Sequence, residues 1–174
     1  GNLYSVREAV KKLKEPIDGF IMNAGGIVGR DPSDMTKYGV PAVVAVNILG
    51  HALMVDLLIE QQKLTGTVIF AGSEAARGVP AMGMKQYKFK NGSLDEFTSM
   101  VDGSSYKVKT IETMYGPTKL IGTLWMSNMA RKHPDMRFIT MSPGGTAGTA
   151  FARDLPAAKK FMMVRVMFPM MKAL

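Results

Sequence analysis

The apolar residues of this chain follow two alternating patterns, and each pattern predicts a kind of secondary structure. In residues 3–14 and 115–131, apolar positions recur at helical spacing, with charged and polar residues between them. Residues 43–63 are long, mostly apolar and compatible with a helix. Such stretches bury one face against a core. The sequence therefore predicts three long helices.

Short apolar runs alternate with these helices. They cover residues 17–22, 67–71 and 136–141, and turn residues bound them. Continuous apolar runs of this length are typical of strands buried on both faces of a parallel sheet. Because strands and helices alternate, we expect an α/β fold in which a doubly wound parallel sheet carries helices on both faces.

The periodic pattern is lost over residues 82–112, which are polar and contain glycine. A short helix is expected to begin at Ser93, whose hydroxyl would form a capping box with Glu96. Irregular segments of this length in a compact domain are usually lids or binding loops. We therefore expect 82–112 to be an inserted, lid-like segment, and the basic, methionine-rich residues 150–174 to be a substrate loop or lid region.

The amino-acid composition limits the kinds of site and partner that we expect for this chain. The 174 residues include no cysteine and two histidines, and no His/Asp/Glu cluster has metal-ligand spacing, so thiol chemistry and a metal site are not expected. The net charge of +8 permits an acidic partner, but the lysines are scattered, which argues against nucleic acid. No apolar run reaches about 20 residues and no signal-peptide core is present, so a cytoplasmic protein is expected.

Each predicted strand leads directly into a distinctive sequence. Asn23-Ala24-Gly25 follows the first strand, Ser73 the second and Pro143-Gly144 the third. In parallel sheets, ligands bind at the carboxyl ends of the strands. These three segments should therefore share one rim, with the helix of Tyr115 beginning beside it.

Tyr115 and Lys119 are four residues apart, a spacing that puts both on one face of a helix. A phenol has a pKa of about 10, but a lysine roughly 4 Å away would favour the phenolate by about 4 kcal/mol, or roughly three pKa units. Tyr115 would then titrate near neutrality and serve in proton transfer. The alternative is a core aromatic residue beside a solvated lysine.

Taken together, these residues resemble the short-chain dehydrogenase/reductase family over about residues 2–150. The matching elements, in order, are Met22-Asn23-Ala24-Gly25, Asn47, Gly72-Ser73-Glu74-Ala75, Tyr115-x-x-x-Lys119 and Pro143-Gly144. The resemblance implies a Rossmann-like sheet and an NAD(P)-dependent oxidoreductase that interconverts a carbonyl and an alcohol.

The resemblance also implies roles for single residues. Tyr115 would be the general acid/base, Ser73 would bond the substrate oxygen, and Lys119 would lower the Tyr115 pKa and bind the nicotinamide ribose. Asn47 would support a water that leads protons to Lys119. The alternatives are that Asn47 bonds backbone and that Ser73 caps a helix.

The implied cofactor is NAD or NADP, and the sequence does not decide between them. Tyr115 and Lys119 would also contact it, and the remaining cofactor-binding positions would be Asn23, Ala24, Gly25, Pro143, Gly144 and Thr146.

The sequence departs from the family in several places. The glycine-rich turn that holds the cofactor pyrophosphate does not precede residue 17, and the family's final strand is not recognisable. We therefore expect residues 1–174 to be a single, incomplete NAD(P)-binding domain and a fragment of a longer protein. The insert is similar to those of retinol dehydrogenases and protochlorophyllide reductases.

Further properties follow as expectations. The insert and the methionines of 161–171 suggest a bulky apolar substrate, and ordinary packing or a subunit contact is an equal alternative for the methionines. The resemblance implies a homo-oligomer paired through the two long helices. Two alternatives remain open. One is an epimerase or dehydratase of the nucleotide-sugar type. The other is a non-catalytic binding fragment whose basic residues 157–174 contact a membrane surface or a partner.

Overall fold

The computed structural model describes residues 2–26, 34–80, 84–107 and 109–144, together with residues 161 and 165. Its strands are β1 (Ile17–Met22), β2 (Leu64–Ala71) and β3 (Arg137–Met141). Its helical elements are α1 (Leu3–Lys12), α2 (Ala42–Val44), the π-helical η1 (Ala45–Leu49), α3 (Gly50–Glu60), the 3-10 helix η2 (Glu74–Arg77), α4 (Leu94–Val101) and α5 (Ile111–Lys132).

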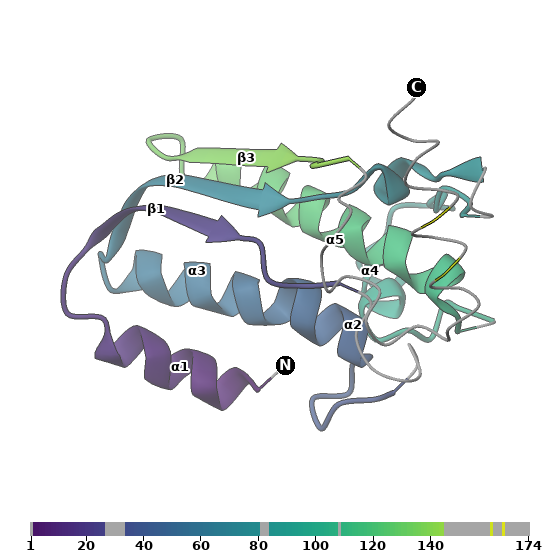
Figure 1. Cartoon of the computed structure of the whole chain (residues 1–174), viewed down its shortest axis with the longest axis horizontal. Coiled ribbons are helices and arrows are strands. Elements are labelled where there is room, and N and C mark those ends of the chain that lie inside the picture. The colour runs from purple at the N-terminus through teal and green to yellow at the C-terminus, as the bar shows by residue number, and fades with distance from the viewer. Residues whose placement is uncertain are drawn as a thin grey trace.

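The strands form a parallel sheet in the order β1-β2-β3 (Figure 1). The three predicted strands are confirmed, although β2 begins three residues early. The reason is Gly66, which resembles a turn residue in the sequence. A Cβ at this position would overlap the Asp18 carbonyl of β1. Glycine therefore allows the first residues of β2 to approach β1 and pair with it.

The two faces of the sheet have different surroundings. Phe70 and Val68 on one face are buried in a core cluster with Ile48 of η1, and Figure 1 shows α1, α3 and α5 on that side of the strands. On the other face, Ile21 is 63% exposed and Ile139 45% exposed. The α/β class with flanking helices is confirmed. The second helical layer that we expected is not found among the described residues.

Elements α2, η1 and α3 form one continuous helix, Ala42–Glu60, which by length and composition alone could cross a membrane. The expectation that no apolar stretch reaches this length does not hold for this helix. Its residues Ile48, Val55 and Leu58 nevertheless belong to the core cluster that includes the sheet. We therefore assign it as a core helix of the fold.

Helix α5 begins at Ile111, four residues before the predicted start. The Thr110 N–H donates to the Thr113 hydroxyl at 2.9 Å, which stabilises the first turn. Further along, a Cβ at Gly122 would overlap Ile48 and Phe70. The glycine therefore lets α5 pack closely against both η1 and the sheet.

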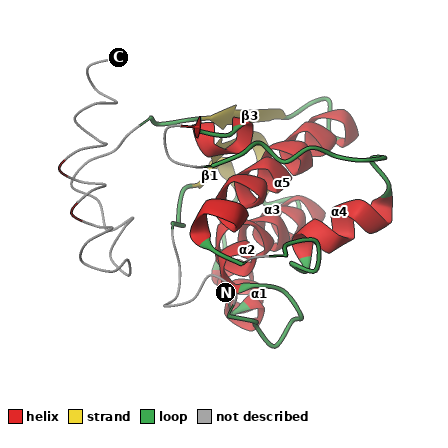
Figure 2. Cartoon of the chain, turned by 90° about the vertical axis from the view of Figure 1, so that its right-hand side faces the viewer, coloured by secondary structure: helices red, strands yellow, loops and turns green. Residues whose placement is uncertain are grey.

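The insert contains α4, whose predicted start at Ser93 is confirmed (Figure 2). The predicted capping box is only half formed. The Ser93 hydroxyl accepts the Glu96 N–H at 3.1 Å, but the Glu96 carboxylate accepts the N–H groups of Lys90, Asn91 and Gly92 at 2.7–3.0 Å. Glu96 therefore orders the turn before the helix instead of closing the box on Ser93.

Candidate active site

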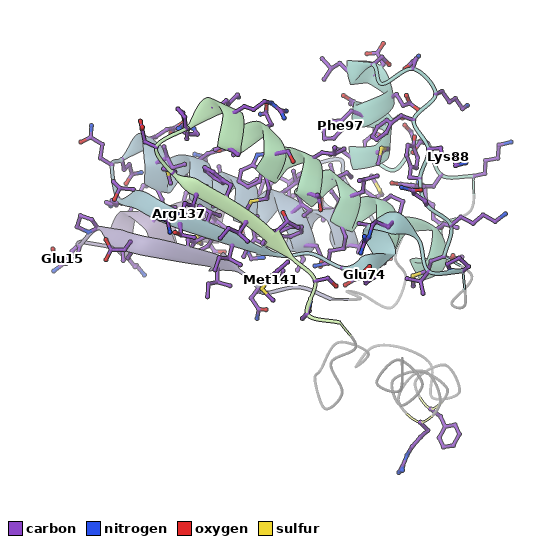
Figure 3. All side chains as sticks on the ribbon, turned by 90° about the horizontal axis from the view of Figure 1, so that it is seen from above. Glu15, Glu74, Lys88, Phe97, Arg137 and Met141 are labelled. Carbon is purple, nitrogen blue, oxygen red and sulfur yellow. The ribbon has the colours of Figure 1, made fainter. Side chains whose placement is uncertain are left out.

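The carboxyl ends of the three strands lie at one edge of the sheet. Figure 3 shows Met141 and Glu74 at this edge, whereas Glu15 and Arg137 lie toward the opposite one. The Gly72 N–H donates to the Met141 carbonyl at 2.7 Å, so the chain segments that leave β2 and β3 begin side by side. The expected rim is therefore present.

Helix α5 packs against η2 at this rim because residue 116 is a glycine. A Cβ at Gly116 would lie 2.5 Å from the carbonyl oxygen of Ala75, a separation that no side chain tolerates. Ser73 is the N-cap of η2, and its hydroxyl accepts the Ala75 N–H at 3.2 Å. The capping role that we considered for Ser73 is thus observed.

Tyr115 is 6% exposed and its phenol bonds the side chain of Ser73. Burial raises the pKa of Tyr115 to about 12, and the bond to Ser73 acts weakly in the opposite direction. The expectation that Lys119 brings this pKa to neutrality is wrong for this structure. Desolvation, which penalises the phenolate, outweighs other effects, so Tyr115 is a protonated phenol at neutral pH.

Lys119 is also buried, and its ammonium donates to the Ala71 carbonyl at 2.8 Å. Its Nζ lies 5.1 Å from the ring centroid of Phe70 and 5.7 Å from that of Tyr115. Burial lowers the pKa of Lys119 to about 8. The residue therefore remains mostly cationic at pH 7, and it ties α5 to the last residue of β2.

Asn47 is 1% exposed and lies in the π-helical segment, a feature that is frequent at functional sites. Its Nδ2 donates to the carbonyls of Gly26 (2.9 Å) and Val43 (2.8 Å), and its Oδ1 accepts the Gly26 N–H at 3.0 Å. These backbone bonds are the alternative that we considered for Asn47. The water that it would support stays a prediction.

The segment Asn23-Ala24-Gly25 lies exposed at the rim after β1. A Cβ at Gly25 would lie 2.5 Å from the Asn47 Oδ1, so glycine is required for Asn47 to reach the loop. The structure thus brings this segment together with Asn47.

His51 also contacts this loop, although its position in the sequence predicted no role for it. Its Nε2 lies 2.6 Å from the Ala24 carbonyl oxygen. Burial lowers the pKa of His51, the charge of Lys119 acts in the same direction, and the bond to Ala24 opposes them. Its position four residues after Asn47 was the available signal, since that spacing puts both side chains on one helix face.

Pro143 and Gly144 follow β3 and are exposed. Gly144 has a φ of +70°, and its N–H donates to the Ser142 hydroxyl at 3.5 Å. Thr146 lies outside the described residues. Within the described ranges, no group of three histidine, aspartate or glutamate side chains is arranged to hold a metal ion.

The short chain dehydrogenase family model matches residues 3–101. This range includes Asn23, Asn47 and Ser73 and ends before Tyr115. No curated protein matches the chain. Among solved structures, the chain is similar to a short chain dehydrogenase family protein from Francisella tularensis subsp. tularensis SCHU S4, with a TM-score of 0.52 and 16% identity. The similarity covers 97% of this chain and 58% of that protein, and it bears on the fold alone.

Proposed function

Because this chain belongs to the short-chain dehydrogenase family, we propose that it provides the catalytic part of an NAD(P)-dependent oxidoreductase that reduces a carbonyl to an alcohol. The observation that carries the proposal is the buried Tyr115 phenol, which bonds Ser73 and lies one helical turn from Lys119. This arrangement can place a proton at a substrate oxygen at the rim of the sheet.

When bound, a nicotinamide cofactor would supply the hydride that the carbonyl carbon accepts. Tyr115 donates its proton to the carbonyl oxygen, and Ser73 orients that oxygen through a hydrogen bond. The Tyr115 pKa of about 12 keeps the phenol protonated. This is the state that a general acid needs when a carbonyl is reduced.

Lys119 stabilises the phenolate that remains after the proton leaves. Its Nζ lies 5.7 Å from the Tyr115 ring centroid, so its positive charge attracts the negative charge of the phenolate. The charge that this requires is present, because the Lys119 pKa of about 8 leaves the ammonium protonated at pH 7.

The residues of the rim fit the nicotinamide end of NAD or NADP. The Lys119 ammonium has three N–H donors, and one of them bonds Ala71, so it can also bond ribose hydroxyls. The exposed Asn23-Ala24-Gly25 and Pro143-Gly144 segments would lie along the cofactor. No glycine-rich turn for a pyrophosphate occurs within the part of the chain that the structure describes.

An apolar substrate is supported by the surroundings of Tyr115. This residue packs in a cluster with Val43, Val44 and Met114, and Met84 and Tyr106 of the insert join the same cluster. The insert thus reaches the side of α5 that carries the phenol. We propose that it covers the bound substrate as a lid.

Tyr115→Phe tests the proposal, because it removes the proton and keeps the ring. We expect carbonyl reduction with NADH or NADPH, assayed on a panel of aliphatic and aromatic aldehydes and ketones, to fall by about 10²–10⁴-fold. The variant should still fold and still bind the cofactor. Tyr87→Phe in the insert is the matched control and should retain activity.

Two results would contradict the proposal. One is Tyr115→Phe turnover within a few-fold of the original chain. The other is the failure of the original chain to reduce any carbonyl on the panel while it remains folded.

A further inference from the structure

Two side chains of one helix bind the backbone of the loop after β1. Asn47 bonds both the N–H and the carbonyl of Gly26, and His51, one turn later, contacts the Ala24 carbonyl at 2.6 Å. Three backbone groups within three successive residues are therefore fixed by side chains. These bonds hold the loop after β1 in one specific conformation.

The His51 contact defines the tautomer of the ring. A carbonyl oxygen can only accept a hydrogen bond, so the Nε2 of His51 must carry the proton. The ring of Phe20 meets the imidazole edge-on, with 6.5 Å between the ring centroids. The positive charge of Lys119 lies close enough to disfavour an imidazolium. His51 is thus a neutral donor whose Nε2 is bonded to Ala24.

Fixing the Ala24 carbonyl also fixes the next N–H group. The peptide unit is planar and trans, so the Gly25 N–H points in the direction opposite to the Ala24 carbonyl. The carbonyl points toward His51, and therefore the Gly25 N–H points away from the helix. Ala24 and Gly25 are both exposed, which makes this N–H a donor available at the rim.

We propose that His51 is a positioning residue for dinucleotide binding, because its Nε2–H holds the Ala24–Gly25 peptide in the orientation that directs the Gly25 N–H at the cofactor. This inference rests on the proposed function and extends it to a residue that does not itself touch the cofactor. It requires a donor at the Nε2 position and not merely a ring of this size.

The test compares His51→Phe with His51→Gln. Phenylalanine keeps the ring and loses the donor, whereas the amide nitrogen of glutamine supplies a donor at a similar reach. We expect NADH and NADPH to bind His51→Phe about five- to tenfold more weakly, the loss that one hydrogen bond accounts for, and His51→Gln to stay within about twofold. His133→Phe is the matched control, since His133 also lies beside an aromatic ring, Phe138, but follows α5 at the far end of the sheet.

A second readout is independent of the cofactor. Nitrogen-15 NMR of the imidazole should show the Nε2–H tautomer of His51 at pH 7, and the Gly25 amide resonance should shift in His51→Phe while the rest of the spectrum indicates a folded chain. An Nδ1–H tautomer, or equal cofactor affinity of His51→Phe and the original chain, would overturn the role of His51 alone. Failure of the original chain to bind either dinucleotide would overturn the proposed function and this inference together.

Discussion

The loops that follow β1 and β3 reach the same rim but are held very differently. After β1, Gly26 is buried and bonded twice to Asn47, and Ala24 is bonded to His51. After β3, Pro143 and Gly144 are exposed, and the Gly144 N–H makes a local bond of 3.5 Å to Ser142.

The difference follows from what packs beside each loop. The helix Ala42–Glu60 sends two polar side chains into the loop after β1. On the other side, α5 packs against η2, and both Tyr115 and Lys119 are buried. The part of the rim that carries Tyr115 and Lys119 is therefore already ordered in the absence of a ligand. Pre-organisation of this kind lowers the entropic cost of binding.

The largest effect is expected from Asn47→Leu, which would make the loop after β1 resemble the loop after β3. Leucine removes three hydrogen bonds from buried backbone groups of Gly26 and Val43, and we expect a loss of about 3–4 kcal/mol in the free energy of unfolding. Urea denaturation would measure it. Asn23→Leu makes the same chemical change on an exposed residue of the same loop and should cost less than about 0.5 kcal/mol. Equal losses in both variants would contradict the conclusion that the Asn47 side chain holds the loop after β1.

A second effect concerns Lys119, whose ammonium anchors α5 to β2. Its pKa is about 8 in the folded chain and 10.5 ordinarily. Between these values the unfolded chain binds the proton and the folded chain does not, so the free energy of unfolding should rise with pH, by at most about 3 kcal/mol.

The raised pKa of Tyr115 reverses the trend above about pH 10, because there the folded chain keeps the phenol proton that the unfolded chain has lost. The rise from Lys119 is therefore clearest between pH 8 and 10. Chemical denaturation across this range should show it in the original chain and in Lys132→Met, an exposed control on the same helix. The same rise in Lys119→Met would show that another group causes it.

The smallest difference in the free energy of unfolding is expected between alanine substitutions of two glycines, Gly116 beside η2 and Gly144 in the loop after β3. In Gly116→Ala the new Cβ meets the backbone of Ala75, and we expect a loss of about 2–3 kcal/mol. Gly144→Ala places a methyl group in open space at a φ of +70°, so it should cost only about 1 kcal/mol. Thermal unfolding would compare them. A larger loss at Gly144 would mean that the loop after β3 is packed more tightly than its exposure indicates.

Periodicity was sufficient to predict the strands and the long helices, because their burial follows directly from the spacing of apolar residues. It failed where a glycine serves tertiary packing. Gly66 resembles a turn but allows β2 to pair with β1, and Gly116 interrupts the apolar pattern but allows α5 to pack against η2.

The residues of the candidate site could be selected from the sequence, but their electrostatics could not. The spacing of Tyr115 and Lys119 gave their common helix face, whereas the opposite shifts of the two pKa values come from burial, which no local pattern reveals. His51 was missed for a related reason. Its partner is a backbone carbonyl from another element, and that contact exists only after the helix has packed against β1.

We propose that this rim binds a nicotinamide cofactor through Lys119 and the loop after β1. Calorimetric titration of the chain with NADH and NADPH tests it most directly. We expect saturable binding with a Kd below about 1 mM for at least one of them, weakened in Lys119→Met and unchanged in Lys132→Met. A folded chain that shows no saturable binding, or equal affinity in Lys119→Met, would contradict it.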